Sequence, residues 1–127
     1  MVGGVLLGGN TTQDPSNPEY LSKAWGAVEK INNQASNNGS YYEVPIKVLS
    51  AKSQVVAGTK YTFDVLFGES ACKKGDLSAT QLNSTNCAYE SGGNRSIYQV
   101  FLWEKPWENF SEYTVTKVRD VAASEQF

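Results

Sequence analysis

Two stretches that alternate between apolar and polar residues, joined by a short connection, most constrain how this chain can fold. The first covers residues 41–52 and the second residues 59–67. A period of two places the apolar side chains on one face of a β-strand. A short connection that contains a glycine predicts a hairpin. The sequence therefore predicts a sheet with one apolar face, which another layer of structure must cover.

The connection between these two strands is unusually apolar and reads Gln54-Val55-Val56-Ala57-Gly58. Hairpin tips are usually built from Asn, Asp, Gly and Ser. Apolar side chains at a tip reduce solubility unless they are buried, either within the protein's own fold or in the groove of a partner. The residue pattern of the tip alone leaves both interpretations open.

A helical pattern precedes the strands. Its apolar residues recur at steps of three and four, namely Leu21, Ala24, Trp25, Val28 and Ile31. This spacing is typical of the buried stripe of an amphipathic helix. Asn17 can cap such a helix, with Pro18 at the first helical position. We expect one helix over residues 18–34, with its stripe anchored by Trp25 and buried against the sheet.

The remainder of the chain supplies two more strands, which we expect over residues 96–104 and 112–121. Residues 68–93 are polar and show no clear period, which predicts an irregular excursion. Residues 1–15 are rich in Gly, Asn and Thr, and we expect a flexible N-terminal arm. The fold class is therefore α+β, with a single long helix wrapped by an antiparallel meander sheet.

The length of the chain fits one domain. We expect residues 1–127 to form a single unit, in which the arm is followed by the helix and sheet over residues 16–127. The chain contains no histidine and two cysteines, which excludes Ser-His-Asp and Cys-His catalysis and a four-cysteine zinc site. We expect neither an enzyme nor a protein with a cofactor.

The charge and hydropathy of the chain argue against two classes of partner. A net charge of −2 gives no electrostatic case for binding nucleic acid or an anionic membrane. The sequence contains no apolar run of the roughly 18 residues that a membrane-spanning helix needs. We therefore expect neither nucleic acid nor membrane as a partner.

Cys72 and Cys87 are either free thiols or partners in one disulfide. The chain also contains five Asn-x-Ser/Thr sequences, at Asn10, Asn38, Asn83, Asn94 and Asn109. Such sequences accept N-linked glycans in secreted proteins. They favour an extracellular glycoprotein with the disulfide formed. A bridge of this span stabilises a fold by about 3 kcal/mol on the chain-entropy model.

Three apolar segments are expected to meet at one end of the sheet. In a meander, the tip at residues 54–58 and the turn at Pro106-Trp107 can lie at the same end, because an even number of strand crossings separates them. The N-terminal arm precedes the helix and can reach that end as well. The three segments would then form one apolar wedge.

The segments of the wedge resemble those of the cystatins, which inhibit papain-like cysteine proteases. Residues 54–58 match the cystatin Gln-x-Val-x-Gly motif, Pro106-Trp107 matches the Pro-Trp of the second hairpin, and Leu6-Leu7-Gly8-Gly9 is similar to the Leu-Val-Gly-Gly that ends the N-terminal trunk. The order and spacing resemble those of secreted type 2 cystatins. Members of that type in parasitic worms show similar departures from the usual cysteine pattern.

The resemblance implies a reversible inhibitor that occupies the cleft of proteases such as papain and the cathepsins without being cleaved. The residues it assigns to protease binding are Leu7, Gly8, Gly9, Gln54, Val55, Val56, Ala57, Gly58, Pro106 and Trp107. The Val-rich tip would enter the cleft, Trp107 would pack on its primed side, and the trunk glycines would bend the trunk away from the catalytic thiol. The alternative is a non-inhibitory secreted protein with the same fold, such as an immunomodulatory one.

Two further expectations concern assembly and a second site. We expect a monomer, with a domain-swapped dimer as the alternative if the strained tip straightens. Ser36-Asn37-Asn38 is similar to the Ser-Asn-Asp through which some type 2 cystatins inhibit legumain, so that the resemblance implies a legumain-binding role for Asn37. The alternative is that Asn37 belongs to a polar helix terminus.

The cysteine pattern departs from that of most type 2 cystatins. Those proteins usually carry two disulfides, and Cys72 and Cys87 match the first pair. Tyr98 stands where the third cysteine would be, and the last cysteine is absent. The resemblance therefore implies one disulfide in this chain.

Deleting residues 1–9 tests the role of the trunk. Because the arm must become ordered when it binds, it should tune affinity for each protease differently. We expect the shortened chain to inhibit papain and cathepsins more weakly, by a factor that differs between proteases in inhibition titrations. An equal affinity of the two forms for every protease would show that the arm takes no part.

Overall fold

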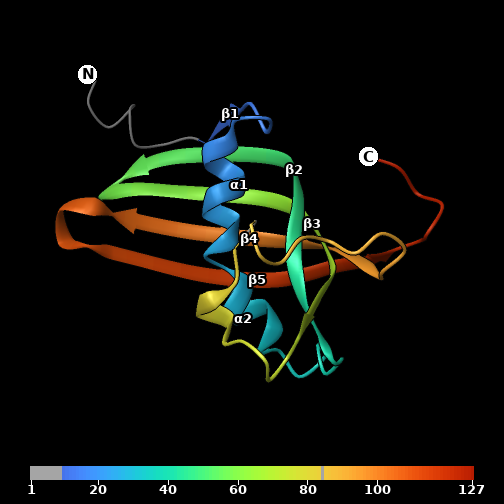
Figure 1. Cartoon of the computed structure of the whole chain (residues 1–127). Helices are drawn as coiled ribbons and strands as arrows, with labels where there is room; N and C mark the ends of the chain where they lie inside the picture. The colour runs from blue at the N-terminus through green and yellow to red at the C-terminus, as the bar shows by residue number, and fades with distance from the viewer. Residues whose placement is uncertain (1–9, 84) are drawn as a thin grey trace, which may run out of the picture.

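The computed structural model describes residues 10–83 and 85–127. An antiparallel sheet of five strands in the order β1-β2-β3-β4-β5 curves around two short helices (Figure 1). The elements are β1 (Thr11–Gln13), α1 (Pro18–Trp25), α2 (Val28–Asn32), β2 (Tyr41–Val56), β3 (Gly58–Lys73), β4 (Arg95–Lys105) and β5 (Phe110–Val121). The predicted α+β class and antiparallel meander are confirmed.

The helical segment is divided in two, so the expectation of one helix over residues 18–34 is wrong. The amides of Gly26 and Ala27 donate hydrogen bonds to carbonyls three residues back, at 3.0 Å each, which tightens the end of α1 into a 3₁₀ turn. Tyr113 of β5 explains this geometry. Its hydroxyl donates a hydrogen bond of 2.8 Å to the Lys23 carbonyl. A Cβ on Gly26 would lie 2.1 Å from the same hydroxyl oxygen.

The sheet has one strand more than predicted. Within the segment expected to be a flexible arm, β1 pairs antiparallel with β2, with Thr11 opposite Ser53. The side chain of Gln13 also donates a hydrogen bond of 2.8 Å to the Ser53 hydroxyl. At the other end, β3 continues to Lys73, so the expected excursion begins six residues later than predicted. These corrections lengthen the sheet without changing its order.

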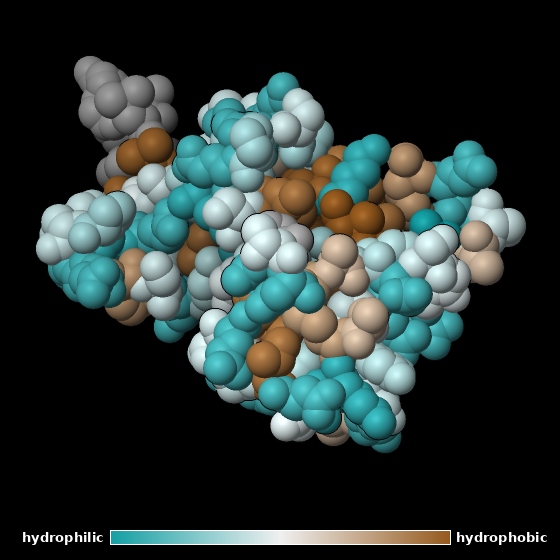
Figure 2. Space-filling model, viewed as in Figure 1, coloured by the Kyte–Doolittle hydropathy of each residue, from teal (hydrophilic) through white to brown (hydrophobic). Residues whose placement is uncertain are grey.

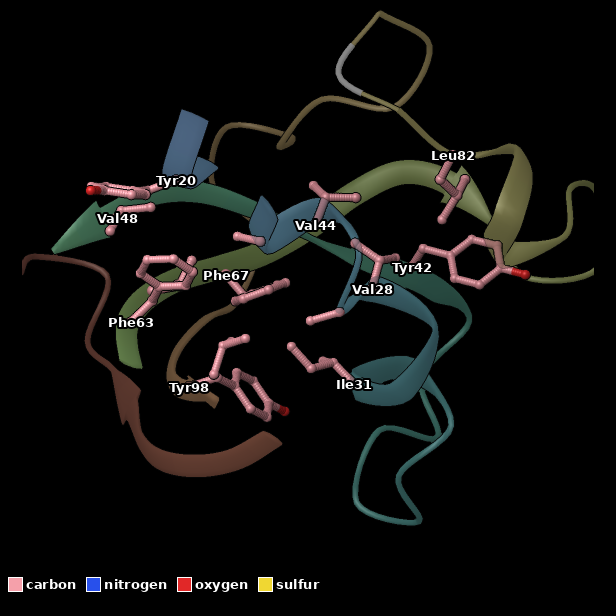
Figure 3. Packing of buried hydrophobic residues seen from close by; sticks show 14 of the residues in the cluster. Tyr20, Val28, Ile31, Tyr42, Val44, Val48, Phe63, Phe67, Leu82 and Tyr98 are labelled. Atoms are coloured by element: carbon pink, nitrogen blue, oxygen red, sulfur yellow. The ribbon is translucent and has the colours of Figure 1, made fainter. Parts of the chain in front are cut away.

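The core lies between the helices and the concave face of the sheet (Figure 3). Its largest side chains come from both layers and include Tyr20, Val28, Ile31, Val44, Val48, Phe63, Phe67, Tyr98 and Val100. Tyr20, rather than Trp25, anchors the helical stripe, with its ring 5.3 Å from that of Phe63. Trp25 is only partly buried at the rim, which corrects the expectation for that residue.

The outer surface of the helix layer is mostly hydrophilic or neutral, and apolar residues show only in gaps between polar ones (Figure 2). A disulfide between Cys72 and Cys87 ties the end of β3 to the loop that carries the 3₁₀ turn η2 (Ala79–Gln81). The disulfide interpretation of the two cysteines is thus confirmed. The bridge lies at the end of β3 that is farther from Gly58.

The buried hydroxyl of Tyr113 makes stability depend on alkaline pH. Burial, with a smaller contribution from the charge of Glu104, raises the pKa of Tyr113 to about 12, from about 10 in an unfolded chain. The folded state therefore holds this proton more tightly, so the stabilisation is complete below about pH 10 and is lost as pH rises toward 12. Tyr113→Phe should be less stable than the wild type at pH 9, by about 0.5–1.5 kcal/mol for the lost hydrogen bond.

Urea unfolding of both proteins at pH 9 and pH 11 checks this expectation. The difference in free energy of unfolding between the two proteins should narrow at the higher pH, because only the wild type has this hydroxyl to ionise. A constant difference at the two pH values would contradict the assignment of the shift to Tyr113.

Candidate functional site

The first hairpin, formed by β2 and β3, ends in a single unpaired residue. Val56 lies opposite Gly58 in the sheet register, which leaves Ala57 alone at the tip. Gly58 has a φ of 91°, and a Cβ at this position would lie 2.0 Å from the carbonyl oxygen of Glu104. Only glycine satisfies both conditions without strain. The side chain of Val55 is 57% exposed, so this tip is not buried in its own fold.

The second hairpin, formed by β4 and β5, presents a tryptophan. It is closed by the 3₁₀ turn η3 (Pro106–Glu108), and Asn109 then takes a left-handed conformation with a φ of 54°. The side chain of Trp107 is 66% exposed. Its indole Nε1 donates a hydrogen bond of 3.3 Å to the neighbouring Glu108 carboxylate. The side chain of Trp107 is therefore not buried within the protein's own fold.

The two tips lie side by side at one end of the sheet, on the left in Figure 1. The register of the strands produces this arrangement, because Thr59 pairs with Glu104 and Lys105 pairs with Phe110. We call this surface, made of residues 54–58 and 106–107, the hairpin edge. Leu7, Gly8 and Gly9 lie outside the described residues. The described chain begins with Asn10, which lines a shallow cleft of about 420 Å³ together with Gln54 of the edge.

The hairpin edge is linked to the helix layer by an ion pair. Lys23 of α1 contacts the carboxylate of Glu104 at 2.7 Å, and both side chains are largely buried. Burial lowers the pKa of Lys23, but the hydrogen bond and charge of Glu104 outweigh it and the net shift is upward. Because the Glu104 carbonyl lies against Gly58, the ion pair holds β4 in place directly behind the first tip.

Sequence reasoning missed one contact at the edge. The indole Nε1 of Trp103, on β4, donates a hydrogen bond of 2.9 Å to the carbonyl of Ala57. The two residues belong to different hairpins. The alternation of apolar and polar residues in β4 predicts which face of the sheet Trp103 lies on, but it does not predict a bond to the other hairpin. A local pattern gives no signal for a bond of this kind.

Asn37 is buried and its side chain is engaged. It is 9% exposed, and its Nδ2 donates hydrogen bonds to the Ile31 carbonyl at 2.6 Å and to the Tyr98 hydroxyl at 2.7 Å. Burial raises the pKa of the Tyr98 hydroxyl, although the bond from Asn37 acts in the opposite direction. These contacts favour the interpretation of Asn37 as part of a polar helix terminus. The legumain-binding role stays a prediction.

A polar cleft of about 460 Å³ lies away from the hairpin edge. It contains Glu43, whose pKa is raised by burial against the opposing charges of Lys117 and Lys74. Lys117 also pairs with Asp120 at 2.7 Å. Among the described residues, no group of His, Cys, Asp and Glu is arranged to hold a metal ion, and no described helix is long and apolar enough to span a bilayer.

Comparison with known proteins identifies the family. Residues 8–120 match the family model described as cystatin domain. The chain is 46% identical over 114 residues to cystatin cpi-1 of Caenorhabditis elegans, covering 89% of this chain and 81% of that protein. It is 38% identical over 117 residues to onchocystatin of Onchocerca volvulus, covering 92% and 70% respectively.

The fold agrees with solved structures of the same family. The salivary cystatin of the soft tick Ornithodoros moubata superimposes with a TM-score of 0.75 at 24% identity, over 88% of this chain and 98% of that one. This chain therefore belongs to the cystatin family, whose members are known as inhibitors of cysteine proteases. The resemblance inferred from the sequence motifs is confirmed.

Asn37→Ala tests the two interpretations of this residue. The substitution leaves the buried Ile31 carbonyl and Tyr98 hydroxyl without this donor, so we expect the free energy of unfolding to fall by about 1–3 kcal/mol. Asn38→Ala, at the exposed neighbour, should leave it nearly unchanged. Urea denaturation of the three proteins measures the difference. An Asn37→Ala protein as stable as wild type that has lost legumain inhibition would establish the binding role instead.

Proposed function

We propose that this chain is a reversible, tight-binding inhibitor of papain-like cysteine proteases such as the cathepsins. It occludes the active-site cleft with the hairpin edge and with the trunk that carries Leu7, Gly8 and Gly9. The observation that carries the proposal is the exposure of Val55 and Trp107, at 57% and 66%, on adjacent tips. Apolar side chains gathered on one edge mark a surface that a partner covers.

The shape of the edge supports insertion into a cleft. A tip of one residue between paired strands is narrow, and its backbone is already ordered before binding. Pre-ordered segments lose little conformational entropy on association, which favours high affinity from an interface of moderate area. A large exposed aromatic side chain such as Trp107 is typical of the residues that dominate binding energy at interfaces.

The same geometry explains how the first tip could occupy a protease cleft and remain intact. A substrate must present an extended strand across the catalytic thiol. Here the chain reverses at Ala57, and strand pairing resumes at once on both sides, between Val56 and Gly58. Gly58 is also held against the Glu104 carbonyl. The peptide bonds of the tip therefore lie in a rigid turn rather than in a cleavable extended segment.

The proposed function includes a location outside the cell and a monomeric active form. The Cys72–Cys87 disulfide supports action outside the cell, since disulfides persist in oxidising compartments. We propose a monomer as the active form, because exchange of strands between copies would have to straighten the tip at Ala57. The alternative remains a non-inhibitory secreted protein of the same fold, with an interaction or immunomodulatory role. Nothing in that role requires Trp107 to be exposed.

Titration of papain with the wild type and with Trp107→Ala tests the proposal. Loss of an aromatic anchor costs about 1–2 kcal/mol or more at an interface, so the inhibition constant should rise roughly tenfold or more. Val118→Ala is the matched control, since Val118 is 54% exposed but lies in the far part of β5. A wild type that does not inhibit papain would favour the non-inhibitory alternative. Equal inhibition by Trp107→Ala would remove the second hairpin from the interface.

A further inference from the structure

The side chain of Trp103 contacts both hairpins of the edge. On one side, its Nε1 donates the 2.9 Å hydrogen bond to the carbonyl of Ala57, the residue at the tip of the first hairpin. On the other, its ring meets the ring of Phe110 edge-on, with centroids 5.4 Å apart and an interplanar angle of 78°. Phe110 is the first residue of β5, directly after the turn that carries Trp107.

Two lysines place their ammonium groups over the indole ring. The ammonium group of Lys105 lies 4.6 Å from the centroids of both the Trp103 and the Phe110 rings. The ammonium group of Lys60 lies 4.9 Å from the centroid of the Trp103 ring. Cations over aromatic faces at this distance are attracted to the ring. Lys105 also pairs with Glu108 of the second turn at 3.6 Å, which extends the cluster to the neighbour of Trp107.

We propose that Trp103 is a positioning residue, which sets where the tip at Ala57 stands relative to Trp107. This inference rests on the proposed function of the hairpin edge. Strand pairing orders the tip up to Val56 and Gly58, and the Trp103 bond fixes the carbonyl of Ala57 between them. The indole N–H holds the tip, while the edge-on contact with Phe110 and the ammonium group of Lys105 hold the indole against the base of the second hairpin.

The consequence is that Trp103 acts through the geometry of the edge in the free protein. Without the N–H donor, the tip would sample other positions, and the protease would have to select the competent one at a cost in affinity. For one partly solvated hydrogen bond we expect the inhibition constant to rise about two- to tenfold. The association rate should carry most of this change, because only the competent fraction of the free protein binds.

The test replaces the N–H donor and keeps the ring. Substitution of Trp103 by β-(3-benzothienyl)alanine puts sulfur in place of the N–H group and keeps both fused rings. Trp103→Phe is the genetically encoded variant, which also removes the N–H group but shortens the ring system. Both should raise the inhibition constant for papain about two- to tenfold and should speed amide hydrogen exchange at Ala57 and Gly58 in the free protein. The midpoint of urea unfolding of the benzothienyl variant should stay within error of the wild type.

Tyr113→Phe is the matched control, because it loses a hydrogen bond of similar length, 2.8 Å to the Lys23 carbonyl, away from the tip. It should lower the unfolding midpoint and leave both papain inhibition and exchange at the tip unchanged. This pattern is the reverse of that expected for Trp103. A purely structural role for Trp103 would give the Tyr113 pattern and would overturn the proposal.

The remaining outcomes separate this proposal from the function on which it rests. If the wild type does not inhibit papain, the proposed function fails, and hydrogen exchange at Ala57 still decides whether Trp103 holds the tip. If the wild type inhibits and neither Trp103 variant changes exchange or inhibition, Trp103 does not position the tip. If inhibition falls while exchange at the tip is unchanged, the indole contacts the protease directly and the positioning role is overturned.

Discussion

The close approach of Gly58 to the Glu104 carbonyl is the contact on which the rest of the edge depends. A side chain at residue 58 would occupy the position of that oxygen, so the first hairpin could not lie flat against β4 at its tip. The same Glu104 pairs through its carboxylate with Lys23 of α1. One residue of β4 therefore contacts the helix layer, the sheet and the first tip.

Stability and the proposed binding function use separate sets of residues. The large buried side chains, such as Phe63 and Tyr98, lie in the body of the sheet and face the helices. A turn of one residue is too short for the chain to fold Val55 back into that core. The apolar surface of Val55 therefore stays exposed. An exposed apolar tip lowers the solubility of the protein. A binding partner that covers the tip is therefore the simplest explanation for it.

The features predictable from the sequence are those that local periodicity encodes. Alternation located β2 to β5 because a period of two directly reflects burial on one face. Two of the three motifs, at residues 54–58 and at Pro106-Trp107, located the hairpin edge. The break in the helix was missed because it depends on the Tyr113 hydroxyl, which comes from the last strand. β1 was missed because Thr-Thr-Gln has no apolar period and is held by backbone pairing. The bond from Trp103 to Ala57 is equally invisible to local patterns.

The single disulfide lies at the end of β3 away from Gly58. At that end of the sheet, the other segments are held by non-covalent contacts. Tyr98 is buried and receives a hydrogen bond from Asn37. Arg95 holds the chain after β5 by donating hydrogen bonds to backbone carbonyls at 2.7 and 2.8 Å. The hairpin edge is instead ordered by strand register, the Gly58 contact and the Trp103 bond. Its geometry therefore rests on contacts that reduction of the disulfide does not touch.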